Sequence, residues 1–236
     1  MTSLKKGIVS VFACLLSVTS FAQTADEIVA KHVEAIGGKE NWLKVKSIKM
    51  ECSMKAQGAE IKMNIAQVNK KAMRYDINVM GMSGWSILTN TEGWSFMPFQ
   101  GQTKPEPMTA DDVKSGQDGL EITDDFLTYK ASGKKLEYLG KDDVDGTECH
   151  KLKMIDKDKK ETTYYMDVDN FYVIKKSQKI QANGKEMEET TMYSNYKKLP
   201  EGIVFAMSFV SGFGQTEIVK LEINPKIDES IFKPTK

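Results

Sequence analysis

A period-two alternation of apolar and polar side chains is the feature that most restricts the folds open to this chain of 236 residues. From residue 48 to 57, apolar side chains alternate with Lys, Glu, Ser and Gln. Successive side chains of a strand point to opposite faces, so this segment is expected to be a half-buried strand. The same alternation recurs after short polar turns, at residues 61–65, 73–79 and 94–96. Sequential strands joined by short turns predict an antiparallel meander.

Helical segments are expected before and within the series of strands. Residues 24–36 carry apolar side chains at helical spacing, with Thr24 placed to cap them and Gly37-Gly38 to end them. Residues 101–132 interrupt the alternation with two prolines and predict one or two short helices. Strand-like segments then resume, at residues 136–139, 150–155, 162–168 and 203–213, with Asn183-Gly184 as a tight turn.

This order of elements favours a mainly β (α+β) architecture. Many strands, one helix in front and a helical insert midway predict a strongly curved antiparallel sheet or open barrel with helices on one face. The sequence contains no internal repeat or low-complexity linker, so we expect one domain over residues 23–236.

The first 22 residues have the pattern of an export signal. Lys5 and Lys6 precede an apolar run at residues 8–18, and Ser20-Phe21-Ala22 offers small residues where a signal peptidase reads them. Eleven apolar residues are short of the roughly 20 that a membrane span needs. Cleavage after Ala22 would leave 31 basic against 33 acidic residues, so a chain that is formally neutral becomes slightly acidic.

Several classes of chemistry find little support in the sequence. Arg74 is the only arginine, so the guanidinium clusters that grip nucleic-acid phosphates are missing. His32 and His150 stand in no metal motif, and we expect neither a metal nor a cofactor. Cys52 and Cys149 could pair in an oxidising compartment, although a buried free thiol suits Cys52 better. Four carboxylate pairs are expected at the solvated surface, at residues 111–112, 124–125, 142–143 and 188–189.

Methionine is the compositional anomaly. Without residues 1–22 the chain has 13 methionines, and eight of them fall within residues 50–108. Methionine is flexible and polarizable, so a sheet face rich in it can adapt to irregular apolar ligands. An ordinary core filled by the same side chains is the competing interpretation. Composition alone leaves both open.

Seven short segments, in their order along the chain, resemble secreted, Bacteroidetes-type members of the outer-membrane lipoprotein-sorting superfamily, the LolA/LolB-like carriers. They are residues 26–40, 45–50, 139–146, 163–167, 193–196, 199–203 and 222–232. The resemblance implies an incomplete barrel whose sheet curves around an apolar cavity, is covered by helices and receives acyl chains of lipoproteins or related lipids. Carriers of this family latch a helical lid through an arginine on the sheet, a role for which Arg74 is the candidate.

We therefore expect a periplasmic, monomeric carrier without enzymatic activity. Its partners would be lipoprotein acyl chains or free lipid, together with membrane-associated donor and acceptor proteins of the envelope. The helical cover would include Phe126 and Leu127. The expected cavity wall is Ile48, Met50, Met54, Ile61, Met63, Ile65, Met73, Tyr75, Ile77 and Val79. Two alternatives remain, a periplasmic scaffold or envelope interaction protein with a filled core and a carboxylate-dependent hydrolase.

Overall fold

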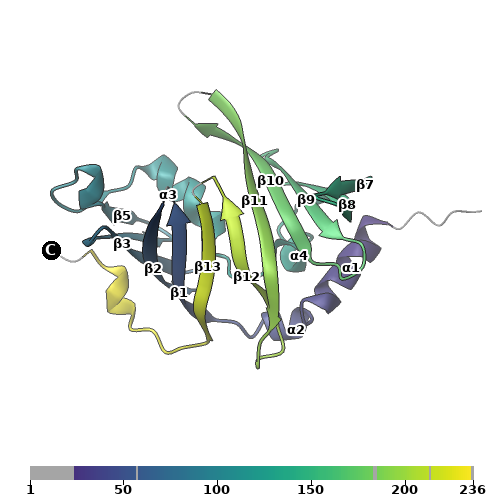
Figure 1. The fold of residues 1–236 in the computed structure, drawn as a ribbon, viewed down its shortest axis with the longest axis horizontal. Helices are drawn as coiled ribbons and strands as arrows, with labels where there is room; N and C mark the ends of the chain where they lie inside the picture. Colours follow the sequence, from purple (N-terminus) through teal and green to yellow (C-terminus); the bar gives the residue numbers. More distant parts are fainter. Residues whose placement is uncertain (1–23, 57, 183–184, 213, 235–236) are drawn as a thin grey trace, which may run out of the picture.

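The computed structural model describes residues 24–56, 58–182, 185–212 and 214–234. Within these residues, thirteen strands form one antiparallel sheet in the order β6-β5-β4-β3-β2-β1-β13-β12-β11-β10-β9-β8-β7. Neighbouring strands follow the chain except at the centre, where β1 pairs with β13. The outer strands β6 and β7 are not neighbours, so the sheet is a curved, incomplete barrel, as expected from the sequence (Figure 1).

The strands range from two to fourteen residues. Their bounds are β1 Ser47–Ala56, β2 Ala59–Val68, β3 Ala72–Val79, β4 Met82–Thr89, β5 Gly93–Phe96, β6 Glu106–Pro107, β7 Lys135–Val144, β8 Thr147–Ile155, β9 Glu161–Asp167, β10 Val173–Ala182, β11 Lys185–Lys198, β12 Val204–Ser211 and β13 Gly214–Ile223. The helices are α1 Ala25–Ala35, α2 Lys39–Trp42, α3 Ala110–Gly116 and α4 Asp125–Thr128, with 3-10 turns η1 Pro98–Gln100, η2 Gln117–Leu120 and η3 Glu229–Phe232.

Cross-strand register confirms that the alternating residues share one face of the sheet. Met50 of β1 stands opposite Ile65 of β2, which stands opposite Tyr75 of β3. Side chains that are directly opposite in an antiparallel pair point to the same side. We call this side the inner face, because the helices α1, α3 and α4 pack against it (Figure 1).

The helices cover different parts of the inner face. Ile28 and Val29 of α1 and Phe126 of α4 pack in one core cluster with Leu152 of β8 and Met166 of β9. Near the other end, Gly116 of α3 lies against Leu88 of β4. The C-terminal segment instead covers the outer face, where Phe232 of η3 joins a cluster with three strand residues, Ala72, Trp85 and Ile87.

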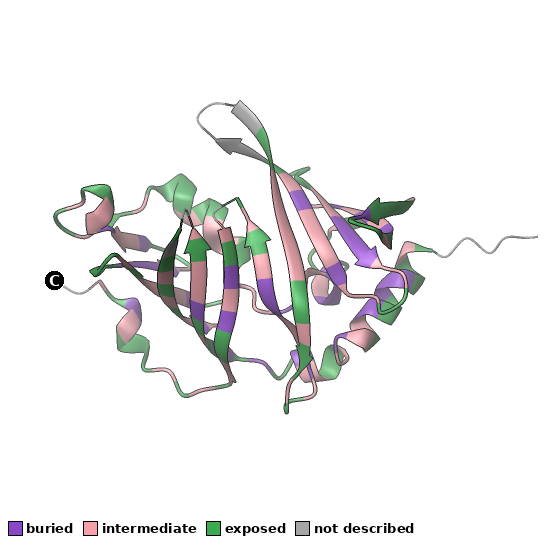
Figure 2. Ribbon diagram, in the orientation of Figure 1, coloured by how far each residue is buried: buried purple, intermediate pink, exposed green. Residues whose placement is uncertain are grey.

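The pattern of buried residues follows from these two covers, the helices on the inner face and the C-terminal segment on the outer face (Figure 2). Strand β4 is buried from Gly84 to Leu88, because helices cover one of its faces and the C-terminal segment covers the other. Cys52 and Cys149 are buried free thiols in separate core clusters. No helix among the described residues is long and apolar enough to cross a membrane. The expected signal at residues 1–22 and the Asn183-Gly184 turn lie outside the described residues.

Candidate functional site: an apolar pocket with a charged end

An apolar pocket of about 340 Å³ lies between the inner face of the sheet, the helices α1 and α2, and the insert that contains α4. We call it the apolar pocket. Its apolar lining residues come from the α1–α2 region, the insert and four strands. They include Ile36, Trp42, Met50, Ile122, Val173, Phe205, Phe209 and Ile218.

The residues at the end of α1 and in the turn after it form one wall of this pocket. A capping box at Thr24 and Glu27 starts the helix, and Gly37 ends it with a φ of +102°. A Cβ at Gly37 would lie 2.1 Å from the carbonyl oxygen of Gly202, so the close approach of these two backbones requires glycine. The turn brings the indole of Trp42 within 2.9 Å of the Ile36 carbonyl oxygen, to which it donates a hydrogen bond.

A charged cluster closes one end of the apolar pocket. Asp125, the first residue of α4, accepts hydrogen bonds from the Tyr164 hydroxyl at 2.5 Å and the Lys134 ammonium at 2.9 Å. The Lys176 ammonium lies 3.4 Å from the same carboxylate. Burial opposes ionisation of Asp125, but Lys176, Tyr164 and Lys134 outweigh it and lower the pKa from 3.8 to about 2. These contacts tie the insert to strands β9 and β10.

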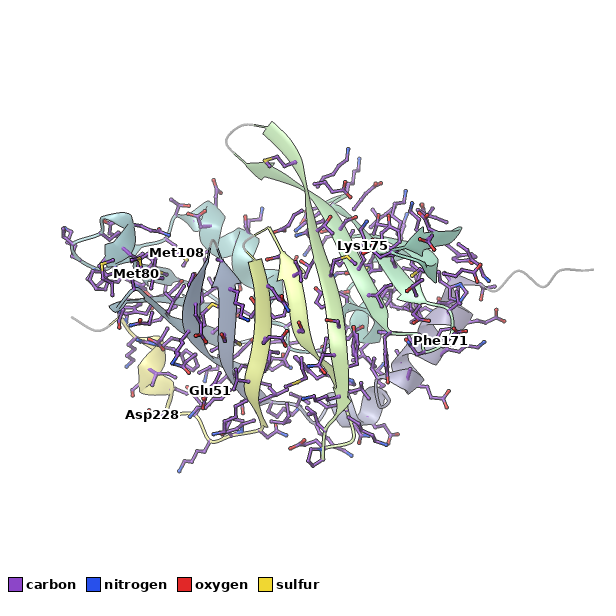
Figure 3. The ribbon with its side chains drawn as sticks, in the orientation of Figure 1. Glu51, Met80, Met108, Phe171, Lys175 and Asp228 are labelled. Carbon is purple, nitrogen blue, oxygen red and sulfur yellow. The ribbon has the colours of Figure 1, made fainter. Side chains whose placement is uncertain are left out.

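Buried His32 and half-buried Asp124 form a second pair at this end. His32 is 1% exposed, and its Nδ1 lies 2.6 Å from the carbonyl oxygen of Phe171, which Figure 3 labels beside α1. Its Nε2 is 3.4 Å from Oδ1 of Asp124, where the charges attract without a well-formed hydrogen bond. Burial lowers the pKa of His32, but the contacts with Asp124 and with the Phe171 carbonyl oxygen together outweigh burial, and the net pKa is raised.

Two tyrosines of β11 complete the polar lining. The Tyr196 hydroxyl donates a 2.6 Å hydrogen bond to the Val173 carbonyl oxygen, and its ring stacks on Tyr172. Burial, together with nearby Asp125 and Asp124, raises the pKa of Tyr193 to about 12. Both phenols are therefore neutral at physiological pH and present hydroxyl groups at the pocket wall.

A second, polar pocket of about 430 Å³ adjoins the first across the same charged cluster. Asp125, Tyr164 and Lys176 line both pockets. The rest of the polar pocket is formed by α3, η2, strands of the inner face and the loops beside them, including Met73, Leu88, Asp118, Lys134, Met154, Asp156, Lys160 and Gln178. The cluster is thus a partition between an apolar and a polar compartment inside the curved sheet.

The wall residues expected from the sequence do not all line one pocket and are spread along the inner face of the sheet. Met50 lines the apolar pocket, and Met73 lines the polar pocket. Ile48 is buried in a core cluster with Ile36, Trp42 and Ile203. The others are half-buried along the inner face of β1–β3 and form what we call the β1–β3 strip, which comprises Met54, Ile61, Met63, Ile65, Tyr75, Ile77 and Val79.

The residues expected to form the cover lie on the inner face of the sheet, whereas the expected latch, Arg74, lies on the outer face. Phe126 and Leu127 are buried on α4, in core clusters that join the insert to α1 and to the sheet. Arg74 lies on the outer face, where it pairs with Asp76 at 2.6 Å and donates a hydrogen bond to the Ile231 carbonyl oxygen. It therefore holds the C-terminal segment, while Asp125 makes an ionic contact between the insert and β10.

Several residues of the site carried little signal in the sequence. Lys176 sits in a strand with many lysines, and nothing local distinguishes it from Lys175. Phe205 and Phe209 belong to the most apolar segment, which predicted a central strand without indicating a pocket. Asp124 and Asp125 were expected at the solvated surface, and this expectation was wrong because the insert folds them inward against β9 and β10.

The same residues limit the chemistry that this site offers. A hydrolase built on two carboxylates needs one of them protonated as a general acid near neutral pH. Asp125 has its pKa held at about 2, and Asp124 faces His32 and accepts a hydrogen bond from the Phe126 amide. Among the described residues, no three His, Cys, Asp or Glu side chains come together in a way that could hold a metal ion.

Solved structures share this architecture. A putative outer membrane lipoprotein-sorting protein domain from Vibrio parahaemolyticus aligns over 88% of this chain and 95% of its own, with a TM-score of 0.54 and 14% identity. A LolA superfamily protein from Nitrosomonas europaea aligns over 90% and 98%, with a TM-score of 0.55 and 14% identity. The chain has a LolA-like fold.

The LolA-like fold recurs with still lower identity. A DUF1329 family protein from Desulfovibrio piger aligns over 90% of this chain and 98% of its own, with a TM-score of 0.53 and 10% identity. No protein-family model matches the sequence, and no curated protein is significantly similar to it. At these identities the likeness concerns the fold, and the function has to be argued from the site.

Proposed function

We propose that the chain is a periplasmic carrier, without enzymatic activity, that holds an acyl chain of a lipoprotein or another lipophilic ligand in the apolar pocket. The observation that carries this proposal is the pocket itself, lined by aromatic and aliphatic side chains from α1, α2, the insert and the strands. Its 340 Å³ falls near the lower end of the roughly 300–1,000 Å³ typical of ligand sites. A scaffold with a filled core has no need of such a space.

Burial of hydrocarbon supplies the binding energy in this proposal. Each methylene that leaves water contributes about 0.8 kcal/mol. Phe205, Phe209 and Ile218 present apolar surface to the ligand, and Met50 adds an adaptable side chain. The β1–β3 strip extends the apolar surface along the inner face, and we propose that longer chains continue onto it. Phe126 and Leu127 would then keep the insert in place as the cover.

The cellular setting follows from the export signal expected at residues 1–22. We propose cleavage after Ala22, a periplasmic location and a monomeric carrier of residues 23–236 that exchanges its cargo with membrane-associated donor and acceptor proteins. The LolA-like fold supports this setting, because one of the structures that shares it is named as a lipoprotein-sorting domain. Transfer between membranes needs reversible binding and no bond cleavage, which agrees with a site whose Asp125 carboxylate is held ionised.

Trp42 offers a direct test, because it lines the apolar pocket while Trp85 and Trp94 pack in the outer-face cluster. A variant with W85F and W94F keeps one fluorophore at the pocket. Bromine quenches indole fluorescence at contact distance, so methyl dibromostearate, an uncharged lipid, should quench this variant. The matched control is W42F, which keeps the two outer-face tryptophans.

The expected result is saturable quenching in the variant that retains Trp42 and little quenching in W42F. Unbrominated methyl stearate should compete with the quencher and restore fluorescence. Equal quenching in both variants would place the lipid elsewhere on the protein. Absence of quenching in the variant that retains Trp42 would contradict the carrier proposal.

A further inference from the structure

The charged end of the apolar pocket contains a loosely paired lysine. Lys176 points from β10 toward the insert, and its ammonium makes the longest of the three contacts to the Asp125 carboxylate, 3.4 Å against 2.9 and 2.5 Å. If Lys176 turned to another anion, Asp125 would keep Lys134 and the Tyr164 hydroxyl as hydrogen-bond donors. Lys176 can therefore change partners without leaving a buried carboxylate unpaired.

The other carboxylate at this end has His32 as its own partner. The Nδ1 of His32 lies 2.6 Å from the carbonyl oxygen of Phe171, and its Nε2 lies 3.4 Å from the carboxylate of Asp124. The negative charge of Asp124 and the carbonyl oxygen of Phe171 both favour the protonated form of His32, whose pKa is raised.

Lys176 is the lysine that the apolar pocket presents at this end. Of the two lysines that pair with Asp125, Lys176 lines both pockets, whereas Lys134 lines the polar pocket, beside Asp118, Asp156 and Lys160. The loosely held ammonium group of Lys176 is therefore the one that a ligand in the apolar pocket can reach.

We infer that the ligand of the apolar pocket is a single-chain amphiphile with an acidic head group, such as a fatty acid, whose carboxylate pairs with the Lys176 ammonium. This inference rests on the proposed function, because it names the ligand class of the same pocket. The alkyl chain lies against Phe205, Phe209 and Ile218, at the apolar side of the lining. The small volume suits one chain, and the Tyr193 hydroxyl at the wall is a further polar group for the head.

The test compares an acid with its neutral analogue on two matched variants. Nile red, an uncharged apolar dye, is bound to the protein at pH 7 and displaced by dodecanoate or by dodecanol, each below its aggregation limit. K176M keeps an unbranched apolar side chain and removes the ammonium. K175M is the control, because Lys175, labelled in Figure 3, lies on the opposite face of β10 with its ammonium 4.7 Å from the Tyr165 ring centroid.

In the wild type and in K175M we expect dodecanoate to displace Nile red at lower concentration than dodecanol. In K176M, dodecanoate should weaken by roughly 10- to 100-fold, the range of one charge-assisted hydrogen bond, while dodecanol stays unchanged. Equal potency of acid and alcohol, with no effect of K176M, overturns the acidic ligand and leaves the carrier proposal standing. Failure of Nile red and of both displacers to bind overturns the two together.

Discussion

Replacing Asp125 with asparagine should loosen the insert from the sheet by an amount that the structure allows us to estimate. The Asp125 carboxylate binds Tyr164, Lys134 and Lys176, and D125N keeps its shape while removing its charge. The lowering of the Asp125 pKa from 3.8 to about 2 corresponds to roughly 2.4 kcal/mol, at 1.36 kcal/mol per pKa unit. Because 32% of the side chain is exposed, solvent screening reduces the expected loss of unfolding free energy to about 1–2 kcal/mol.

The pH dependence gives this prediction a definite sign. A carboxyl whose pKa is lowered by folding stabilises the protein above its ordinary pKa, and that contribution disappears as the pH falls through the folded value. The difference between wild type and D125N should therefore be constant near neutrality and shrink between about pH 4 and pH 2.

Urea unfolding followed by tryptophan fluorescence, repeated across this pH range, measures both the size and the pH dependence of the loss. Asp111 is the matched control, because it is an exposed aspartate on α3 of the same insert, and D111N should leave stability unchanged. A D125N variant as stable as wild type at pH 7 would show that the Asp125 carboxylate does not hold the insert. A difference that persists undiminished below pH 3 would show that the loss does not come from the charge of Asp125.

Three further changes test other parts of the account. His32 has a raised pKa, because its contacts with Asp124 and Phe171 together outweigh burial. Its contribution to stability should therefore be complete below about pH 6.5 and decline as the pH rises through the folded pKa. Urea unfolding from pH 6 to 9 should show this decline in wild type and not in H32N. G37A should lower the free energy of unfolding by at least about 2 kcal/mol, because φ is +102° and the added Cβ meets the Gly202 carbonyl oxygen. G38A, with a φ of +84° and open space around the Cβ, should lower it by about 1 kcal/mol. Equal thermal stability of the two variants would contradict the close approach at Gly37. M50A should weaken binding of methyl stearate by roughly tenfold, because Met50 lines the apolar pocket. M63A, on the β1–β3 strip, should have a smaller effect. Displacement of Nile red by methyl stearate measures both.

Local sequence patterns predicted most of the strands and the inner face. The alternation from residue 48 onward placed Met50, Ile65 and Tyr75 on one side of the sheet, and the register confirms it. Thr24 caps α1 as expected, and residues 101–132 contain the short helices α3 and α4. In these segments local chemistry and tertiary packing favour the same structure.

Strand β4 had no such pattern, for a physical reason. Trp85, Ser86, Ile87 and Leu88 are all buried, because η3 covers one face of the strand and the α3–η2 segment the other. Alternation appears only where one face of a strand meets water. The residues of β4 therefore show no alternation from which a strand could be predicted.

The pocket could not be located from the sequence because it depends on long-range pairing. β1 pairs with β13, which brings Met50 beside Ile218 and Phe209, residues far apart in the chain. The wall expected on β1–β3 alone therefore includes one residue of the apolar pocket, Met50. The inward position of Asp125 depends likewise on the contact between the insert and β10.

The central claim is that the apolar pocket carries a lipid in the cell. The most direct measurement is native mass spectrometry of the protein purified gently, without detergent, from the cells that make it, with any bound lipid identified after extraction into organic solvent. We expect part of the native protein to carry a lipid that added dodecanoate displaces. Protein free of lipid in native spectra, together with no uptake of added fatty acid or neutral lipid, would contradict it.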